Sequence, residues 1–124
     1  MNSSIASVLI TEYQPSPLAA PFTIATISGE IDLSNAEQIG LQLNDASQQH
    51  ANLIIDLSAI IYIDSQGARM LQHLASRHTH GVLRLNIIAP RNSIARKLLS
   101  ITAIDQTVPV IESLDAATRE ESPE

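Results

Sequence analysis

Apolar and polar residues alternate along the first third of the chain in a pattern that predicts two β-strands. The alternation is weak over residues 5–13 and clearer over 22–28, where Gly29 is expected to end the second strand. Three prolines lie within residues 14–21 and predict an extended loop, because proline disrupts both helices and sheet ladders. Since a loop without a helix joins the two strands, we expect them to form an antiparallel pair.

A helix is predicted after this strand pair. Ser34 followed by Glu37 matches a capping box, in which each side chain accepts a hydrogen bond from a backbone N–H at the helix start. The helix is expected to continue to about Gln49. Its apolar face carries Ala36, Ile39, Leu43 and Ala46.

The middle of the chain predicts a buried strand and a second helix. The apolar run at residues 52–57 is typical of a strand that is covered on both faces. Residues 60–63 are expected to form an apolar connection that ends at Asp64. The helix then extends over about residues 65–78, with Ala68, Leu71, Leu74, Ala75 and His78 at helical spacing, and Gly81 ends it.

The last third of the chain continues the alternation of strands and helices. Residues 82–88 predict a fourth strand, and residues 92–93 begin a third helix. Residues 107–111 predict a last, short strand, which Pro109 restricts to the edge of the sheet. A terminal helix at 112–118 is consistent with the pattern. The inward face of the third helix is expected to carry Ile94, Leu98 and Ile101.

Strands that alternate with helices predict a single α/β domain in which helices cover a largely parallel sheet. The domain is expected to span the 124 residues, with flexible ends at residues 1–4 and 118–124. An apolar content of 44% argues for an ordered core, and the absence of cysteine excludes disulfides and thiolate metal sites.

Charge is distributed unevenly along the chain. The formal net charge is −6, and all seven basic residues lie at or after Arg69. Seven acidic residues precede Arg69, so surface from the first half is expected to be negative, either attracting a basic partner or simply keeping the protein soluble. This balance disfavours nucleic-acid binding. Neither a membrane span nor a signal peptide is evident, which favours a cytoplasmic location.

The segment Asp64-Ser65-Gln66-Gly67 lies at the junction of an apolar segment and a helix. A hydroxyl in the first turn of a helix is near outward-pointing N–H groups and the positive end of the helix dipole, which favour a phosphate. The alternative interpretation is that Asp64 or Ser65 caps the helix and has no further role.

An assembled catalytic or metal site is not evident, and no cofactor is expected. Ser65-x-Gly67 is half of a hydrolase nucleophile elbow, but Ile63 occupies the position where the elbow requires glycine. His73 lies two turns from Ser65, too far to act as its base. The histidines at 73, 78 and 80 lack the spacing of a zinc helix. The sequence therefore favours a binding protein over an enzyme.

Three segments resemble the bacterial anti-sigma factor antagonists of the STAS (sulfate transporter and anti-sigma factor antagonist) family. They are Gly29-Glu30-Ile31-Asp32-Leu33, then Leu53 to Ser58 with Tyr62-Ile63-Asp64-Ser65, and finally Leu83 to Leu99. The resemblance covers residues 22–117 and implies a small mixed sheet with helices packed mainly on one face. It also implies transcription regulation through an anti-sigma factor of the serine-kinase type, whose capture frees a sigma factor.

The resemblance also implies roles for individual residues. Ser65 matches the serine that the partner kinase phosphorylates and that a serine phosphatase restores. Asp32 matches an acidic residue near that serine. The partner-binding surface is expected to comprise Asp32, Asp64, Ser65, Gln66, Gly67 and Arg69.

Two residues near Ser65 depart from the family pattern. Gln66 replaces a small hydroxyl residue, and Arg69 stands where glycine is common. Arg69 is four residues after Ser65, where it is suited either to pair with a phosphate or to obstruct a basic partner. The alternative function is therefore a STAS interaction module or scaffold subunit without a phosphorylation switch. The oligomeric state is left open.

Overall fold

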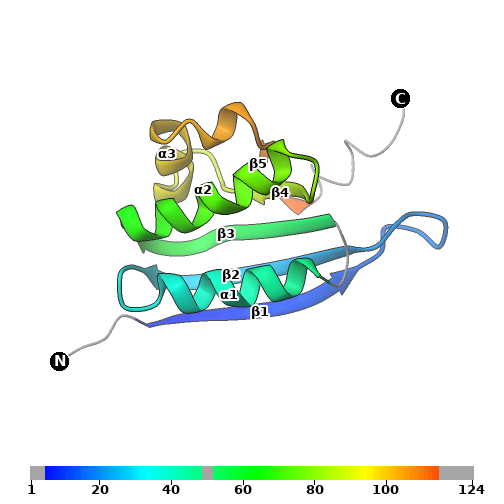
Figure 1. Ribbon diagram of the computed structural model, residues 1–124, viewed down its shortest axis with the longest axis horizontal. Coiled ribbons are helices and arrows are strands. Elements are labelled where there is room, and N and C mark those ends of the chain that lie inside the picture. The colour runs from blue at the N-terminus through cyan, green and yellow to red at the C-terminus, as the bar shows by residue number, and fades with distance from the viewer. Residues whose placement is uncertain (1–4, 49–51, 115–124) are drawn as a thin grey trace.

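The computed structural model describes residues 5–48 and 52–114, which form one five-stranded sheet covered by three α-helices (Figure 1). In chain order the elements are β1 (Ala6–Tyr13), β2 (Phe22–Ile31), α1 (Ala36–Ser47), β3 (Asn52–Ile63), α2 (Ser65–Thr79), β4 (Arg84–Ile88), α3 (Ile94–Ile101), the 3₁₀-helix η1 (Ile104–Gln106) and β5 (Val110–Ile111).

The spatial order of the strands is the same as their order in the sequence, β1-β2-β3-β4-β5. β1 pairs antiparallel with β2, and every later pair is parallel, which confirms the predicted mixed α/β sheet. Parallel strands are joined by right-handed crossovers in nearly all proteins. Because the strand order always advances in one direction, these crossovers direct the helices to the same face of the sheet.

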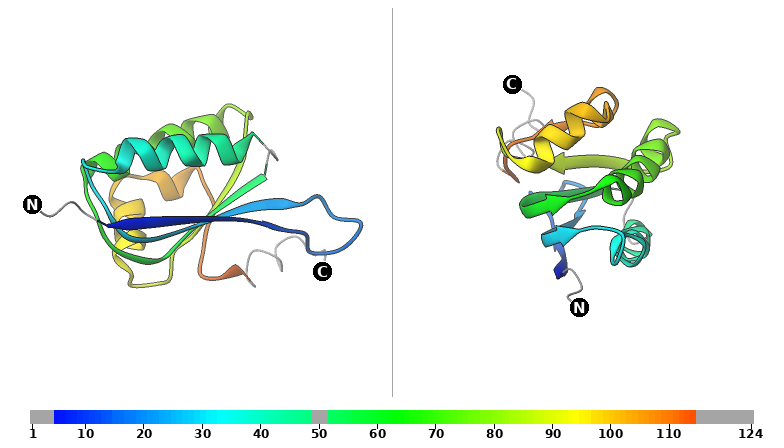
Figure 2. Two further views of the ribbon diagram at one scale, coloured as in Figure 1. Left: turned by 90° about the horizontal axis from the view of Figure 1, so that it is seen from below. Right: turned by 90° about the vertical axis from the view of Figure 1, so that its left-hand side faces the viewer.

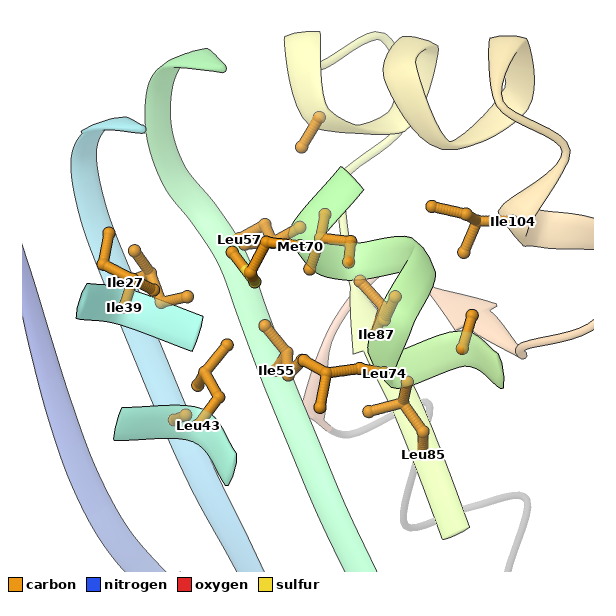
Figure 3. Close-up of a cluster of buried hydrophobic side chains, with 14 of the residues drawn as sticks. Ile27, Ile39, Leu43, Ile55, Leu57, Met70, Leu74, Leu85, Ile87 and Ile104 are labelled. Carbon is orange, nitrogen blue, oxygen red and sulfur yellow. The ribbon is translucent and has the colours of Figure 1, made fainter. Parts of the chain in front are cut away.

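Figure 2 shows α1 and α2 side by side on that face. The main hydrophobic core lies between the sheet and the helices (Figure 3), and buried residues of α1, α2 and α3 all belong to it. Its best-buried side chains include Ile27, Ile55 and Leu57 from the strands and Leu43, Leu71 and Leu99 from the helices.

A smaller apolar cluster lies on the opposite face of the sheet. It consists of Phe22, Ile54, Ile88 and Ile111. Side chains along a strand alternate between faces, so Ile54 points away from the helices while Leu53 and Ile55 point toward them. β3 is therefore buried on both faces along its first half, as its continuous apolar run predicts.

Two strands extend further than their sequence patterns indicate. β2 continues through Gly29 to Ile31, and the predicted connection at residues 60–63 belongs to β3. The β2–β3 register shifts on either side of Gly29, whose φ is +96°. Glycine adopts this left-handed conformation without steric cost. A Cβ atom at this position would lie 2.2 Å from the carbonyl oxygen of Ile5. The glycine thus permits an irregularity within the strand.

The predicted capping box is wrong. α1 begins at Ala36, with Asn35 as its N-cap, and no side chain caps the helix. The Ser34 hydroxyl instead donates to Oδ1 of Asp32 at 2.7 Å. Asn35 stabilises the preceding turn, because its Oδ1 accepts from Asp32 N–H and its Nδ2 donates to the Glu30 carbonyl.

The predicted inward face of α3 is also partly wrong. Ala95 and Leu99 are fully buried, whereas Ile94 is 49% exposed and Ile101 is 75% exposed. β4 begins two residues later than predicted, at Arg84. β5 is confirmed as an edge strand, although it spans only Val110–Ile111.

Several predictions fall outside the described residues. They concern the chain ends at 1–4 and 118–124 and most of the terminal helix at 112–118. The first helix ends at Ser47, close to the predicted end at about Gln49. Within residues 5–48 and 52–114, no helix is long and apolar enough to cross a membrane. In the same part of the chain, no group of three or more His, Cys, Asp or Glu side chains is arranged to hold a metal ion.

Candidate functional site

The predicted site lies where β2 and β3 end, at one edge of the sheet. These parallel strands stay paired to their last residues, because Ile31 pairs with Ile63 after the register shifts around Gly29. Asp64 N–H then donates to the Ile31 carbonyl at 3.1 Å. The pairing brings Asp32 and Asp64, which follow the two strands directly, to the same edge although 32 positions separate them in the sequence.

Asp64 is the N-cap of α2. Its Oδ1 accepts a hydrogen bond from Gln66 N–H at 2.8 Å and a second from Gly67 N–H at 3.1 Å. The carboxylate thereby satisfies two of the N–H groups that have no partner within the helix, and its charge complements the helix dipole. Of the two capping residues that the sequence permits, the structure selects Asp64.

Ser65 is the first residue of α2 and is exposed to solvent. Among the residues that the structure describes, none forms a hydrogen bond with its hydroxyl. Because Asp64 provides the cap, the hydroxyl of Ser65 is available for chemistry at the surface. An added phosphate would lie at the positive end of α2 and directly beside the capping carboxylate.

Asp32 is half-buried in the turn that leads into α1. Its Oδ1 accepts from Ser34 N–H at 2.9 Å and from the Ser34 hydroxyl at 2.7 Å. These bonds fix the carboxylate at the edge of the sheet that also holds Asp64. The structure therefore brings Asp32 to the edge that holds Asp64 and Ser65, which belong to a separate segment of the sequence.

The remaining predicted site residues differ in accessibility. Gln66 is half-buried and Arg69 is exposed one turn beyond Ser65. Gly67 is buried, and a Cβ atom at this position would lie 2.5 Å from Cγ1 of Ile63 and 3.0 Å from Cγ2 of Ile31. Gly67 therefore permits the close packing of α2 against the strand ends and offers little surface to a partner.

Sequence reasoning missed the apolar surface at this edge. Leu33, immediately after Asp32, is 75% exposed. An apolar residue within a polar turn is a sequence signal that could have indicated this exposed apolar surface. Ile94 and Ile101, which the periodicity assigned to the core, line a shallow hollow of about 240 Å³ together with Ile63 and Lys97. The site thus combines carboxylates and a hydroxyl with exposed apolar side chains, as protein-binding surfaces do.

Comparison with solved structures yields several matches of the same fold. An anti-sigma factor antagonist from Mycobacterium paratuberculosis is 21% identical, with a TM-score of 0.77 over 94% of this chain and 93% of that chain. The unphosphorylated anti-sigma factor antagonist SpoIIAA is 16% identical, with a TM-score of 0.65 over 94% and 99% of the two chains. SpoIIAA of Bacillus in its phosphorylated form is 18% identical, with a TM-score of 0.57 over 90% and 98%.

The TM-scores of these structures, at 16–21% identity, show a shared fold. No curated protein matches the sequence. The model of the STAS domain family matches residues 15–117, which include the whole sheet from β2 to β5 and all three helices. This match covers well over half of the 124 residues. The chain therefore belongs to the STAS domain family.

Proposed function

We propose that this STAS domain is an anti-sigma factor antagonist whose binding is switched off by phosphorylation of Ser65. In this proposal it binds an anti-sigma factor of the serine-kinase type in the cytoplasm and thereby frees a sigma factor. A serine phosphatase restores binding. The observation that carries the proposal is the exposed hydroxyl of Ser65 at the start of α2, which has no hydrogen-bond partner among the described residues and lies beside a carboxylate already used as the cap. The fold shared with solved anti-sigma factor antagonists, one of them phosphorylated, supports it.

The charge of a phosphate accounts for the switch. Phosphorylation adds −1.5 to −2 charges next to Asp64, at the edge of the sheet that also holds Asp32. A partner that covers this edge would have to remove the phosphate from water while two carboxylates nearby repel its charge. A cost of about 3 kcal/mol weakens binding roughly a hundredfold, within the range for an imperfectly paired buried charge. A local change at the interface is sufficient, and no rearrangement of the fold is required.

Arg69 modifies this switch. It is exposed and lies four residues after Ser65 on α2, so the two side chains share one face of the helix. A guanidinium one helical turn from Ser65 attracts a phosphate on that residue and holds it against the surface that the partner must cover. Arg69 thereby favours retention of the phosphate at the interface over its exposure to solvent.

Binding measurements with Ser65 variants test the proposal. The serine-kinase-type anti-sigma factors of the source organism are purified and titrated with wild-type protein, Ser65→Ala and Ser65→Asp. We expect Ser65→Ala to bind like wild type and to resist phosphorylation, and Ser65→Asp to bind about tenfold more weakly or worse. Mass spectrometry of the protein from its own cells, with phosphatases inhibited, is expected to find phosphate on Ser65. Equal binding by both variants, or an unmodified Ser65 in every growth condition, overturns the switch.

A constitutive interaction module is the second candidate. Gln66 beside Ser65 and the exposed Arg69 one turn later favour it, because both depart from the family pattern at the phosphorylation motif. In that case a partner binds the same edge, but Ser65→Ala and Ser65→Asp have equal affinities. Both candidates are non-enzymatic roles.

A further inference from the structure

A groove runs between α1 and α2 on the outer side of the helical layer. Its volume is about 640 Å³. Gly40 and Leu41 of α1 and Met70 and Leu74 of α2 contribute an apolar floor. Leu41 is 57% exposed and adds apolar surface to one side of the groove. Because Gly40 has no side chain, the groove stays open at its centre, where a Cβ atom would lie 3.0 Å from Cγ of Met70.

One wall of this α1–α2 groove is basic. Arg69, His73 and Arg77 recur at every fourth position of α2 and all line the groove. Among the described residues, no carboxylate pairs with either arginine, and Arg77 instead donates to Asn44 Oδ1 and Ser47 Oγ. Two of the seven basic residues of a chain with net charge −6 are thus concentrated in one apolar groove. That local excess of positive charge is complementary to an acidic ligand.

We propose that the α1–α2 groove binds an acidic amphipathic helix of a partner protein. The side-chain ridges of a partner helix can pack into the groove between α1 and α2, as helices pack against one another in proteins. The apolar stripe of that helix would cover the exposed side chain of Leu41. Arg69 and Arg77 are eight residues apart on α2, or about 12 Å along the helix axis. The matching partner helix carries carboxylates about two turns apart on one side of that apolar stripe. Glu37 lines the groove at the end nearest the start of α1 and favours a basic or neutral residue there.

The groove is separate from the proposed phosphorylation switch. It extends away from Ser65 along α2, and neither Ser65 nor Asp32 nor Asp64 lines it. Gln66 and Arg69 belong to both surfaces. The proposal therefore holds for a STAS module with or without phosphorylation of Ser65.

A designed peptide tests the proposal with the full chain. The probe is an amphipathic helix of about 18 residues, ~27 Å long, with leucines on one face and glutamates flanking them. A matched peptide carries lysine in place of every glutamate. Each is titrated into ¹⁵N-labelled protein, and amide chemical shifts are followed. We expect the glutamate peptide to shift residues of α1 and α2 around the groove and the lysine peptide to bind about tenfold more weakly or worse.

Two variants locate the binding site. Arg69→Glu is expected to weaken binding of the glutamate peptide about tenfold or more. Arg91→Glu makes the same change of charge on an exposed residue that lines neither the groove nor the hollow beside Ile63, and it is expected to change the affinity less than about twofold. Unchanged amide spectra confirm that both variants fold.

Three results overturn the proposal. One is equal affinity for the glutamate and lysine peptides, and another is an equal effect of the two variants. The third is a change in the amide chemical shifts of the groove residues with protein concentration when no peptide is present. That result would identify a second copy of this chain as the occupant.

Discussion

A Cβ atom on Gly67 would lie 2.5 Å from Cγ1 of Ile63, so only glycine lets the first turn of α2 rest against the end of β3. Ile63 is branched at Cβ and has little freedom to move aside. This contact holds Ser65, two residues earlier, at the edge where β2 and β3 end. The packing of a buried glycine therefore determines where the exposed hydroxyl lies.

Gly67→Ala is expected to destabilise the protein by about 1–3 kcal/mol, because the added methyl group overpacks the contact with Ile63 and Ile31. Urea unfolding measures the change. Gly40→Ala is the control, because its Cβ would meet only the flexible Met70 side chain at 3.0 Å. Both substitutions gain helix propensity. A Gly67→Ala protein as stable as Gly40→Ala would contradict the packing role.

Asp64→Ala is expected to cost about 1 kcal/mol of stability, because the N–H groups of Gln66 and Gly67 lose their common acceptor. Asp64→Asn keeps an acceptor oxygen and removes the charge, so it should recover most of this loss. Thermal unfolding of the wild-type protein and the two variants provides the comparison. If the asparagine variant were no more stable than the alanine variant, the charge of Asp64 and not its capping bonds would account for the effect.

Asp32→Ala is expected to weaken binding of the anti-sigma factor, and a second aspartate provides a matched control. Asp56 Oδ1 accepts from Ser58 N–H at 2.9 Å and from the Ser58 hydroxyl at 2.7 Å, the same two bonds that Asp32 makes with Ser34. Each variant loses these two hydrogen bonds, at a cost of about 1 kcal/mol. Only Asp32 lies at the edge with Asp64, so only Asp32→Ala should lower the affinity, by about tenfold. Equal affinities of the two variants in a titration would exclude Asp32 from the interface.

His78→Ala is expected to destabilise the packing of α2 against β4. The Leu85 N–H donates to Nδ1 of His78 at 3.0 Å, which requires the neutral ring with its proton on Nε2. Leu85 is fully buried, so loss of the acceptor leaves a buried N–H unpaired at a cost of about 1–3 kcal/mol. His78→Asn offers an amide oxygen near the position of Nδ1 and should recover part of the loss. Hydrogen exchange of the Leu85 amide should accelerate in the alanine variant, and an unchanged rate would argue against this bond.

The sequence by itself determined the order and type of the elements. Each buried face produces a local pattern of apolar residues, which can be read from the sequence. Examples are the alternation of residues 22–28, the apolar run at 52–57 and the helical spacing of residues 65–78. Ser65 and Asp64 could also be selected from sequence, because a hydroxyl and an acid at a strand–helix junction have a local physical reason.

The tertiary structure decided the features that depend on contacts between distant residues. α3 has apolar residues on two overlapping faces, and packing against β3 rather than periodicity buried Ala95 and Leu99 and left Ile94 and Ile101 exposed. The parallel register of Ile31 with Ile63 brought Asp32 to the edge that holds Asp64, and the close approach of α1 and α2 created a groove with one basic wall. The local sequence pattern indicates which apolar side chains gain free energy by being buried. Only the packing of the helices on the sheet determines which of them are buried and which polar groups become neighbours.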